Sequence, residues 1–210
     1  VDFNIANAKR VIDTIKPKAG TDIVFFYYSG HGFRYADDVS KFPRISFRTT
    51  RLQLRAINNL GVEEVYNQLL AKRARVTIVI SDCCNENIGA SVPVGMNLLR
   101  PRSSGTEGLK VNYDNFKKLF LPSQTVSIIV GSAEKNQLAV GNPSMGGYFT
   151  NYFQAQLQNS LYTSTGESSW LRLLIKAKEN TTQKALSALC KETAHGRCIQ
   201  RAEFRVLPPL

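Results

Sequence analysis

The segment DIVFFYYSGHG (residues 22–32) begins as a continuous run of apolar and aromatic residues and ends in two glycines that flank a histidine. A second segment, VTIVISDCCN (residues 76–85), follows the same pattern and ends in an aspartate and two cysteines. Short apolar runs that stop at small or polar residues are typical of buried parallel strands. We therefore expect two strands of one sheet, with a histidine after the first and a cysteine after the second.

The segments around these strands alternate between helical and extended patterns. Apolar residues at helical spacing predict helices at 5–15, 62–70, 115–121, 149–157, 170–177 and 185–190. Pro17 and Gly20 end the first pattern, and Asn58 or Asn59 could cap the second helix. Further strands are expected at 45–47, 125–130 and 203–207. This order predicts an α/β sandwich with a mostly parallel sheet, whose functional residues lie at the carboxyl ends of the strands.

Size and composition fit one globular domain. The chain has 210 residues, of which 43% are hydrophobic and 20% are charged, and this balance excludes extended disorder. The longest apolar runs, 23–28 and 76–80, are far shorter than the roughly 20 residues that span a bilayer, so no membrane partner is expected. Residues 34–55 and 85–110 are expected to form flexible loops. The compartment, cytoplasmic or reached by export, stays open.

The net charge of +11 keeps an anionic partner open. Basic residues with aromatic residues between them occur at 34–55 and 170–205, where they could contact phosphates. Neither stretch contains a recognised nucleic-acid motif, and basic helices are usually solvated faces. Nucleic-acid binding is therefore the least favoured of the functions considered.

The cysteines and histidines are too few for a disulfide scaffold or a spaced zinc site. They are Cys83, Cys84, Cys190, Cys198, His31 and His195. Cys190 and Cys198 could pair in an oxidising compartment, but Cys190 falls on the apolar stripe of the helix expected at 185–190, which favours a place in the core. His195 also precedes a glycine, but it follows a helical pattern rather than a strand, so we do not expect it to be catalytic.

A histidine and a cysteine at neighbouring strand ends are the parts of a cysteine hydrolase. A thiolate attacks a carbonyl, and a histidine can take the thiol proton and later protonate the leaving amine. Gly32 has no side chain, so its N–H can approach a developing oxyanion, and the N–H of the nucleophile is a second donor. Either residue alone is more often structural, whereas the pair after two such strands is as consistent with a hydrolase as with a structural role.

Four motifs resemble the caspase and metacaspase family of cysteine peptidases. YYSGHG (27–32), SDCCN (81–85), GSAEKNQ (131–137) and GGYFT (146–150) occur in the family's order. The Asp-x-Cys form of the second motif resembles bacterial metacaspase-like proteins more than animal caspases. The resemblance implies a three-layer caspase-like sandwich over residues 1–210 that acts as an endopeptidase on polypeptide substrates. A catalytically silent binding or scaffold module of the same fold is the alternative.

The resemblance also implies the roles of the residues at the two strand ends. Cys84 matches the nucleophile and His31 the base and acid, while Cys83 is a neighbour that faces the core. The backbone N–H groups of Gly32 and Cys84 would form the oxyanion hole.

By the same resemblance, Asp82 lies at the floor of the primary substrate pocket. A carboxylate there offers a charge-assisted partner to arginine or lysine, which predicts cleavage after basic residues. The alternative is that Asp82 orders the turn through local hydrogen bonds. Ser29, Ser132 and Ala133 are further implied substrate-binding residues.

Members of the family are often cut in the segment that follows the nucleophile. Arg100, Arg102 and Lys110 lie there, so an enzyme selective for basic residues could process itself at these positions. A solvated basic loop is the alternative. The mechanism requires no cofactor or metal, although calcium activation stays open because Asp37 and Asp38 could supply oxygen ligands. Two adjacent carboxylates are more often plain surface.

Only one helix precedes the 22–32 segment, whereas in the family that strand is preceded by a first strand, a helix and another strand. We therefore expect the domain to be N-terminally incomplete, with its first strands missing and a hydrophobic sheet edge exposed. An N-terminal fragment that completes the sheet, either as a separate chain or as a part outside the given sequence, is the expected partner.

Overall fold

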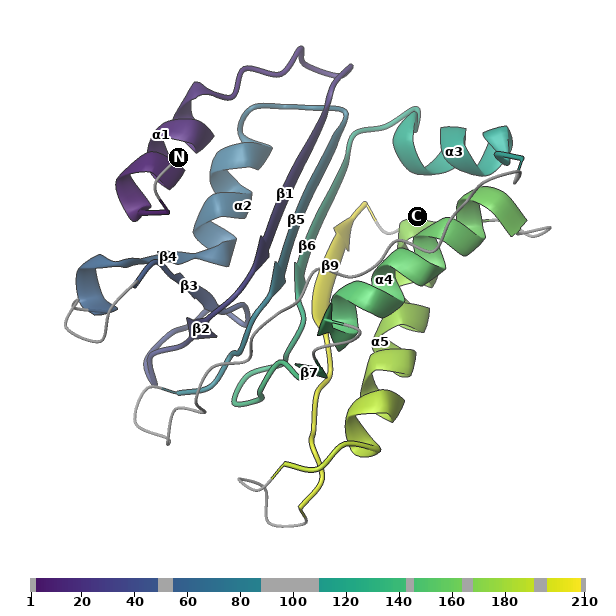
Figure 1. Ribbon diagram of the computed structural model, residues 1–210. Coiled ribbons are helices and arrows are strands. Elements are labelled where there is room, and N and C mark those ends of the chain that lie inside the picture. Colours follow the sequence, from purple (N-terminus) through teal and green to yellow (C-terminus); the bar gives the residue numbers. More distant parts are fainter. Residues whose placement is uncertain are drawn as a thin grey trace.

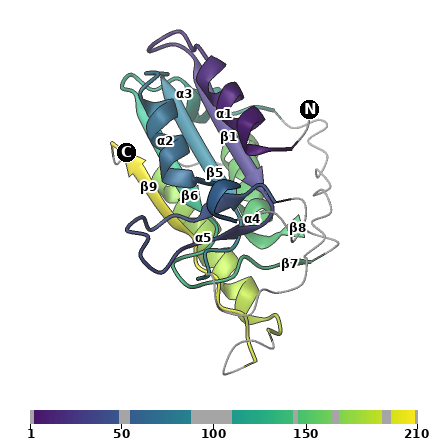
Figure 2. The same cartoon turned by 90° about the vertical axis from the view of Figure 1, so that its left-hand side faces the viewer.

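The computed structural model describes residues 3–48, 55–87, 110–142, 146–163, 168–190 and 196–208. Its main sheet contains four strands in the order β1 (Ile23–Ser29), β5 (Val76–Asp82), β6 (Val126–Gly131) and β9 (Glu203–Leu207). The first three strands are parallel and β9 is antiparallel to β6. Helices cover both faces of the sheet (Figures 1 and 2). The predicted three-layer α/β sandwich with a mostly parallel sheet is therefore confirmed.

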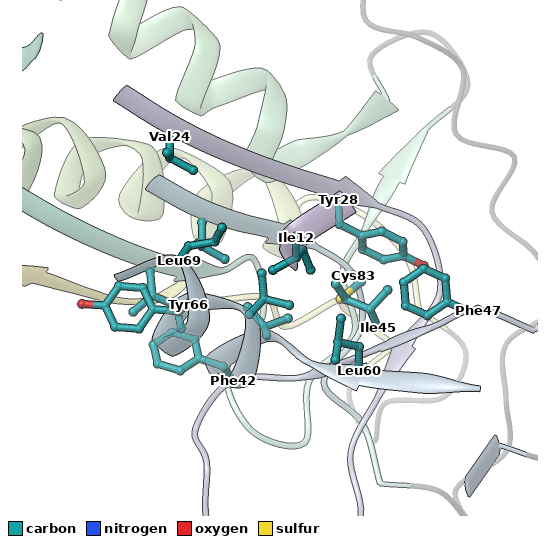
Figure 3. Packing of buried hydrophobic residues seen from close by; sticks show 14 of the residues in the cluster. Ile12, Val24, Tyr28, Phe42, Ile45, Phe47, Leu60, Tyr66, Leu69 and Cys83 are labelled. Carbon is teal, nitrogen blue, oxygen red and sulfur yellow. The ribbon is translucent and has the colours of Figure 1, made fainter. Parts of the chain in front are cut away.

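Helices α1 (Ile5–Thr14) and α2 (Val62–Leu70) cover one face of the sheet. Their apolar stripes pack on β1 and β5 in a core that Figure 3 shows around Tyr66 and Leu69. The prediction that Asn58 or Asn59 caps α2 is wrong, because Gly61 occupies the N-cap. The side chain of Asn59 instead donates to the carbonyls of the turn before it, which includes the 3-10 helix η1 (Arg55–Ile57).

Helices α3 (Tyr113–Phe120), α4 (Tyr148–Gln158) and α5 (Trp170–Leu186) cover the opposite face. A π-helical turn, η2 (Asn159–Thr163), follows α4. The two helices expected at 170–177 and 185–190 are one helix, which ends before Leu189, and Leu189 is 80% exposed. Apolar spacing alone could not reveal this continuity, because the turns between the two apolar stripes consist mostly of polar residues, which continue the helix without extending the stripe. No helix among the described residues is long and apolar enough to cross a membrane.

Two small sheets lie near the carboxyl end of the main sheet. The strands β2 (Gly32–Phe33), β3 (Arg44–Ser46) and β4 (Asn59–Gly61) are antiparallel, as are β7 (Gly141–Asn142) and β8 (Gly146–Gly147). In the stretch expected to be a loop at 34–55, the described residues 34–48 are packed by apolar side chains, which include Phe42, Ile45 and Phe47. This packing fixes the chain that follows His31.

Strand β1 differs from the buried strand that its composition predicts. It lies at the edge of the sheet, and the side chains on one of its faces, Ile23, Phe25 and Tyr27, are 41%, 53% and 44% exposed. The opposite face, with Val24 and Tyr28, is buried against α1 and α2. Exposure here depends on neighbouring elements, since the core under α3, α4 and α5 contains described residues of β5, β6 and β9 but none of β1.

Candidate active site

The parallel pairing of β1 and β5 brings the two predicted strand ends together. Ser29 lies opposite Asp82 in the register, and the Gly30 N–H donates to the Asp82 carbonyl over 3.2 Å. The chain then leaves β1 through His31 and leaves β5 through Cys84. The sequence prediction that both motifs meet at one edge of the sheet is therefore confirmed.

Gly32 lies against the two cysteines. A Cβ at this position would overlap the Cys83 sulfur and would lie 2.6 Å from the Cys84 carbonyl oxygen. Only glycine allows the two segments to approach this closely. The contact places the backbone after His31 directly beside the backbone of Cys84.

The two adjacent cysteines, which follow the last residue of β5, have different surroundings. The Cys83 side chain is buried among Tyr28 and Ile45, as Figure 3 shows, whereas Cys84 is only partly buried. Burial raises the pKa of the Cys83 thiol well above its usual value. Of the two cysteines, Cys84 is therefore the more accessible one, and its role as the nucleophile stays a prediction.

The Cys84 thiol contacts the backbone of Ala139. The Ala139 N–H donates to the Cys84 Sγ over 3.4 Å, and the thiol lies 3.9 Å from the Ala139 carbonyl oxygen. Burial raises the pKa of the thiol, the Ala139 N–H lowers it, and the carboxylates of Glu86 and Asp82 raise it. The resting thiol is therefore protonated at neutral pH and needs a base.

His31 is exposed at the start of the segment that follows β1. Its carbonyl accepts hydrogen bonds from the Tyr28 hydroxyl at 2.8 Å and from the Ser46 N–H at 2.9 Å, which fixes the backbone. Among the described residues, the imidazole of His31 has no hydrogen bond to the Cys84 thiol. Catalytic hydrogen bonds are often long or unformed without substrate, so this geometry leaves the predicted pair open.

Asp82 is 3% exposed and its carboxylate is bound by α4. The Oδ2 atom accepts the backbone N–H of Thr150 at 3.1 Å and its hydroxyl at 2.6 Å, and Gly147 packs against the same oxygen. Burial raises the pKa of Asp82, and the hydrogen bonds from Thr150 and Ser132 lower it. These contacts join Asp82 to α4, 68 positions away, and are not the local hydrogen bonds of the alternative. The role in specificity stays a prediction.

The other predicted substrate-binding residues lie around the same edge. Ser29 is exposed at the end of β1, whereas Ser132 and Ala133 are fully buried after β6. The Ser132 hydroxyl donates to the Cys83 carbonyl over 3.4 Å. Ser29 pairs with Asp82 and the Ala133 carbonyl accepts the Asn85 amide, so all three lie near the end of β5, but of the three only Ser29 is exposed.

Three buried polar residues near Cys84 were not expected from the sequence: Arg34, Asn85 and Gln200. The guanidinium of Arg34 donates to the carbonyls of Asp38 at 2.6 Å and Ser40 at 3.3 Å. Asn85 and Gln200 bond to the chain on either side of Ala139. The only feature of the sequence that could have indicated a role for Asn85 is its position directly after a buried strand. No feature of the sequence indicated a role for Gln200.

The remaining candidates are less central. Asp38 forms an ion pair with Arg44 at 2.7 Å, and no described group of three or more potential ligands could hold a metal ion. Lys110 is exposed. Arg100, Arg102 and His195 lie outside the described residues.

Cys190 and Cys198 form a disulfide, which corrects the expectation that Cys190 belongs to a helix in the core. Because α5 ends at Leu186, Cys190 lies in the segment after the helix, where a bridge pairs Leu189 with Arg197. Cys198 is buried beside Val140 and Tyr148, so the disulfide holds this segment near the chain that contacts Cys84.

Comparisons with known proteins bear on the fold and the family of the chain. The chain is similar to caspase-1 from Spodoptera frugiperda, with 10% identity and a TM-score of 0.52 over 97% of this chain and 69% of that chain. Protein GSU0716 from Geobacter sulfurreducens is 17% identical, with a TM-score of 0.47 over 97% of this chain and 73% of that chain. No curated protein sequence matches the chain. The family model of the caspase domain matches residues 2–196, so the chain belongs to the caspase-domain family of cysteine peptidases.

Proposed function

We propose that the protein is a metacaspase-like cysteine endopeptidase that hydrolyses peptide bonds after arginine or lysine. The observation that carries the proposal is the Cys84 thiol, which is partly exposed just after the carboxyl end of β5. Gly32, the residue after His31, packs against Cys83 and the Cys84 carbonyl. A scaffold function would not need a reachable thiol at this position.

In the proposed reaction, His31 takes the proton of Cys84, and the sulfur attacks the carbonyl carbon of the substrate. The N–H groups of Gly32 and Cys84 stabilise the negative oxygen. His31 then gives its proton to the leaving amine, and water hydrolyses the thioester to release the acid and the free thiol. The raised pKa of Cys84 makes the histidine necessary, since the resting thiol is protonated at neutral pH.

The preference for a basic side chain rests on local charge. The chain carries a net charge of +11, yet among the described residues the charged groups that act on the Cys84 thiol are the carboxylates of Glu86 and Asp82. A cationic side chain beside the cleaved bond would meet favourable potential there, and an acidic one would be repelled.

Fluorogenic peptides that differ only in the residue before the cleaved bond test this proposal. Arginine and lysine substrates should be cleaved, aspartate substrates should not, and Cys84→Ala should abolish cleavage. Asp82→Asn should lower activity on arginine more than on a neutral residue, whereas Asp114→Asn, on the exposed first turn of α3, serves as the matched control. Cleavage after aspartate would contradict the specificity, and cleavage by Cys84→Ala would contradict the nucleophile. Parallel assays with calcium or a chelator measure calcium activation.

Self-processing at Arg100, Arg102 or Lys110 is part of the proposal. Lys110 is exposed directly before α3, where a second molecule can reach the backbone. Incubation of wild type beside Cys84→Ala, followed by mapping of the new termini by mass spectrometry, measures it. The same cuts in both proteins would point to a contaminating protease.

We further propose that an N-terminal fragment pairs with β1 and completes the sheet. No strand among the described residues pairs with the outer edge of β1, and Ile23 and Phe25 expose apolar surface on the same strand. Open strand edges of this kind favour pairing with another strand. Native isolation from the natural source should recover a fragment that protects the β1 amides from hydrogen exchange. Isolation without such a fragment, with rapid exchange of β1, would contradict the proposal.

A further inference from the structure

Asn85 directly follows the nucleophile and is fully buried. Its backbone N–H donates to the Gln137 carbonyl at 2.9 Å, and its own carbonyl accepts the Asn136 N–H at 2.9 Å. Its side-chain amide also donates to the Ala133 carbonyl at 3.1 Å. Three hydrogen bonds thus fix the residue after Cys84 to the segment 133–137.

The same side chain reaches the segment that follows His31. The Asn85 amide donates to the Lys41 carbonyl at 2.8 Å, and its Oδ1 accepts a hydrogen bond from Arg34 at 3.4 Å. Asn85 therefore joins three segments: the chain after β2, the end of β5 and the chain after β6.

Gln200, which precedes β9, holds the chain on the other side of Ala139, at Val140. Its Oε1 accepts the Val140 N–H at 2.9 Å, and its Nε2 donates to the Ser132 carbonyl at 2.9 Å. The side chain is fully buried, and its backbone carbonyl accepts the Thr182 hydroxyl of α5 at 3.0 Å. The oxygen and the nitrogen of the side-chain amide are thus both used, and they join Val140 to Ser132.

Between these two anchors lies Ala139, whose N–H donates to the Cys84 sulfur at 3.4 Å. A donor at the sulfur stabilises the thiolate more than the thiol, so its presence makes the nucleophile easier to ionise. The donor is a backbone group, and its position depends on what holds the neighbouring residues. The side chain of Gln200 fixes the next residue, Val140. Asn85 fixes Gln137 through its backbone N–H, and its side chain fixes Ala133, at the start of the same stretch of chain.

We propose that Asn85 and Gln200 are positioning residues, which hold the Ala139 N–H at the Cys84 sulfur and so set the reactivity of the nucleophile. The inference rests on the proposed function only in that Cys84 is the nucleophile of the reaction. Thiol reactivity can be measured without any peptide substrate, so the two can fail separately.

The test is the rate at which iodoacetamide alkylates Cys84 between pH 6 and pH 10.5, measured by mass spectrometry without reductant, so that the Cys190–Cys198 disulfide stays closed. Cys84→Ala gives the background. Asn85→Ala and Gln200→Ala should each lower the rate at pH 7 by about three- to tenfold, with a much smaller difference at pH 10.5, because the variants move ionisation to higher pH. If peptides are cleaved, kcat at neutral pH should fall more than KM rises.

Asn59 provides a matched control. Its side chain also donates to two carbonyls, those of Arg55 at 2.7 Å and Ala56 at 3.1 Å, and accepts from an arginine, Arg44, at 3.0 Å. Asn59→Ala should lower the melting temperature but leave the alkylation profile within about twofold of wild type.

Wild-type alkylation profiles in folded Asn85→Ala and Gln200→Ala would overturn the inference, as would an equal shift in Asn59→Ala. If Asn85→Ala fails to fold, as judged by circular dichroism, Gln200→Ala decides, and an alkylation profile equal to that of Asn59→Ala would overturn the inference. Shifted profiles in a protein that cleaves no peptide would support the inference and contradict the proposed function.

Discussion

The Asp82 carboxylate at the end of β5 accepts both the backbone N–H and the hydroxyl of Thr150, at 3.1 Å and 2.6 Å. Thr150 is in the first turn of α4, so the carboxylate binds a helix N-terminus, where negative charge is favoured. The Tyr27 hydroxyl lies 2.9 Å from the Thr150 hydroxyl and adds β1 to the network. The strand end that carries Cys84 is thereby tied to α4 and β1 at once.

The stability of this network should depend on pH through Asp82. Burial raises the pKa of Asp82 above 3.8, so the folded state binds the proton more tightly than the unfolded state. This contribution to stability is complete below the unfolded pKa and is lost as the pH rises through the folded pKa. Asn at this position does not titrate. The free energy of unfolding of Asp82→Asn, relative to wild type, should therefore increase from about pH 4 to pH 7.

Urea unfolding at several pH values measures this difference. The single tryptophan, Trp170, is buried and donates its indole N–H to the Leu119 carbonyl, so its fluorescence reports the transition. Thr150→Val in place of Asp82→Asn keeps the titrating carboxylate and should retain the pH dependence. A difference between Asp82→Asn and wild type that stays constant across the range would contradict the prediction.

The sequence predicts the central elements of this fold because their environment is uniform. β5 and β6 are mostly apolar and are buried along their whole length, so composition alone identifies them. β1 has the same composition but alternates between buried and exposed, because its exposure depends on neighbours that the local sequence does not show. Short patterns likewise could not show that α5 is continuous or that Cys190 lies beyond it.

The candidate site divides in the same way. Cys84, His31 and Gly32 belong to local motifs at strand ends and could be predicted from them. The partners that hold the site are distant in the sequence, since Asp82 bonds to Thr150 across 68 positions and Val140 bonds to Gln200 across 60. Such contacts arise from the packing of whole helices and strands, so no local sequence motif predicts them.

His31→Ala should separate peptide hydrolysis from the reactivity of the resting thiol. Burial raises the pKa of Cys84, and no hydrogen bond joins the thiol to the His31 ring in the part of the chain that the structure describes. The variant should lose peptide cleavage by about 100-fold or more, as for removal of a general base. Its alkylation by iodoacetamide should follow the wild-type pH profile and should still be rising at pH 9. A lower ionisation pH in wild type than in His31→Ala would show that the ring already acts on the resting thiol.

Gly32→Ala should disturb both stability and thiol reactivity. The new Cβ would overlap the Cys83 sulfur and crowd the Cys84 carbonyl, so the two strand ends must separate. Overpacking of this kind costs about 1–3 kcal/mol in the free energy of unfolding. Urea unfolding and Cys84 alkylation measure the two effects. Gly61→Ala is the control, because its nearest contact, the Glu64 Cβ, is at an ordinary 3.5 Å. Equal unfolding free energies for Gly32→Ala and Gly61→Ala would contradict the close approach.

Opening the Cys190–Cys198 disulfide should destabilise the protein. The bridge spans eight positions, and closing a loop of that size stabilises the folded state by about 2–3 kcal/mol in the chain-entropy description. Cys198 lies two residues before Gln200 and packs against Val140 and Tyr148. Loss of the disulfide should therefore also loosen the chain around Ala139, which donates to the Cys84 sulfur. Reduction of wild type should therefore lower both the urea midpoint and the rate of Cys84 alkylation at pH 7.

The double variant Cys190→Ser, Cys198→Ser separates the bridge from other effects of the reductant. It should have the reduced protein's urea midpoint whether or not reductant is present, because its only remaining cysteines, Cys83 and Cys84, form no disulfide. The alkylation rates are compared after removal of reductant. A variant as stable as oxidised wild type would show that the segment is held by its buried contacts rather than by the bridge. A loss of stability with unchanged Cys84 alkylation would show that Gln200 keeps its place at Val140 without it.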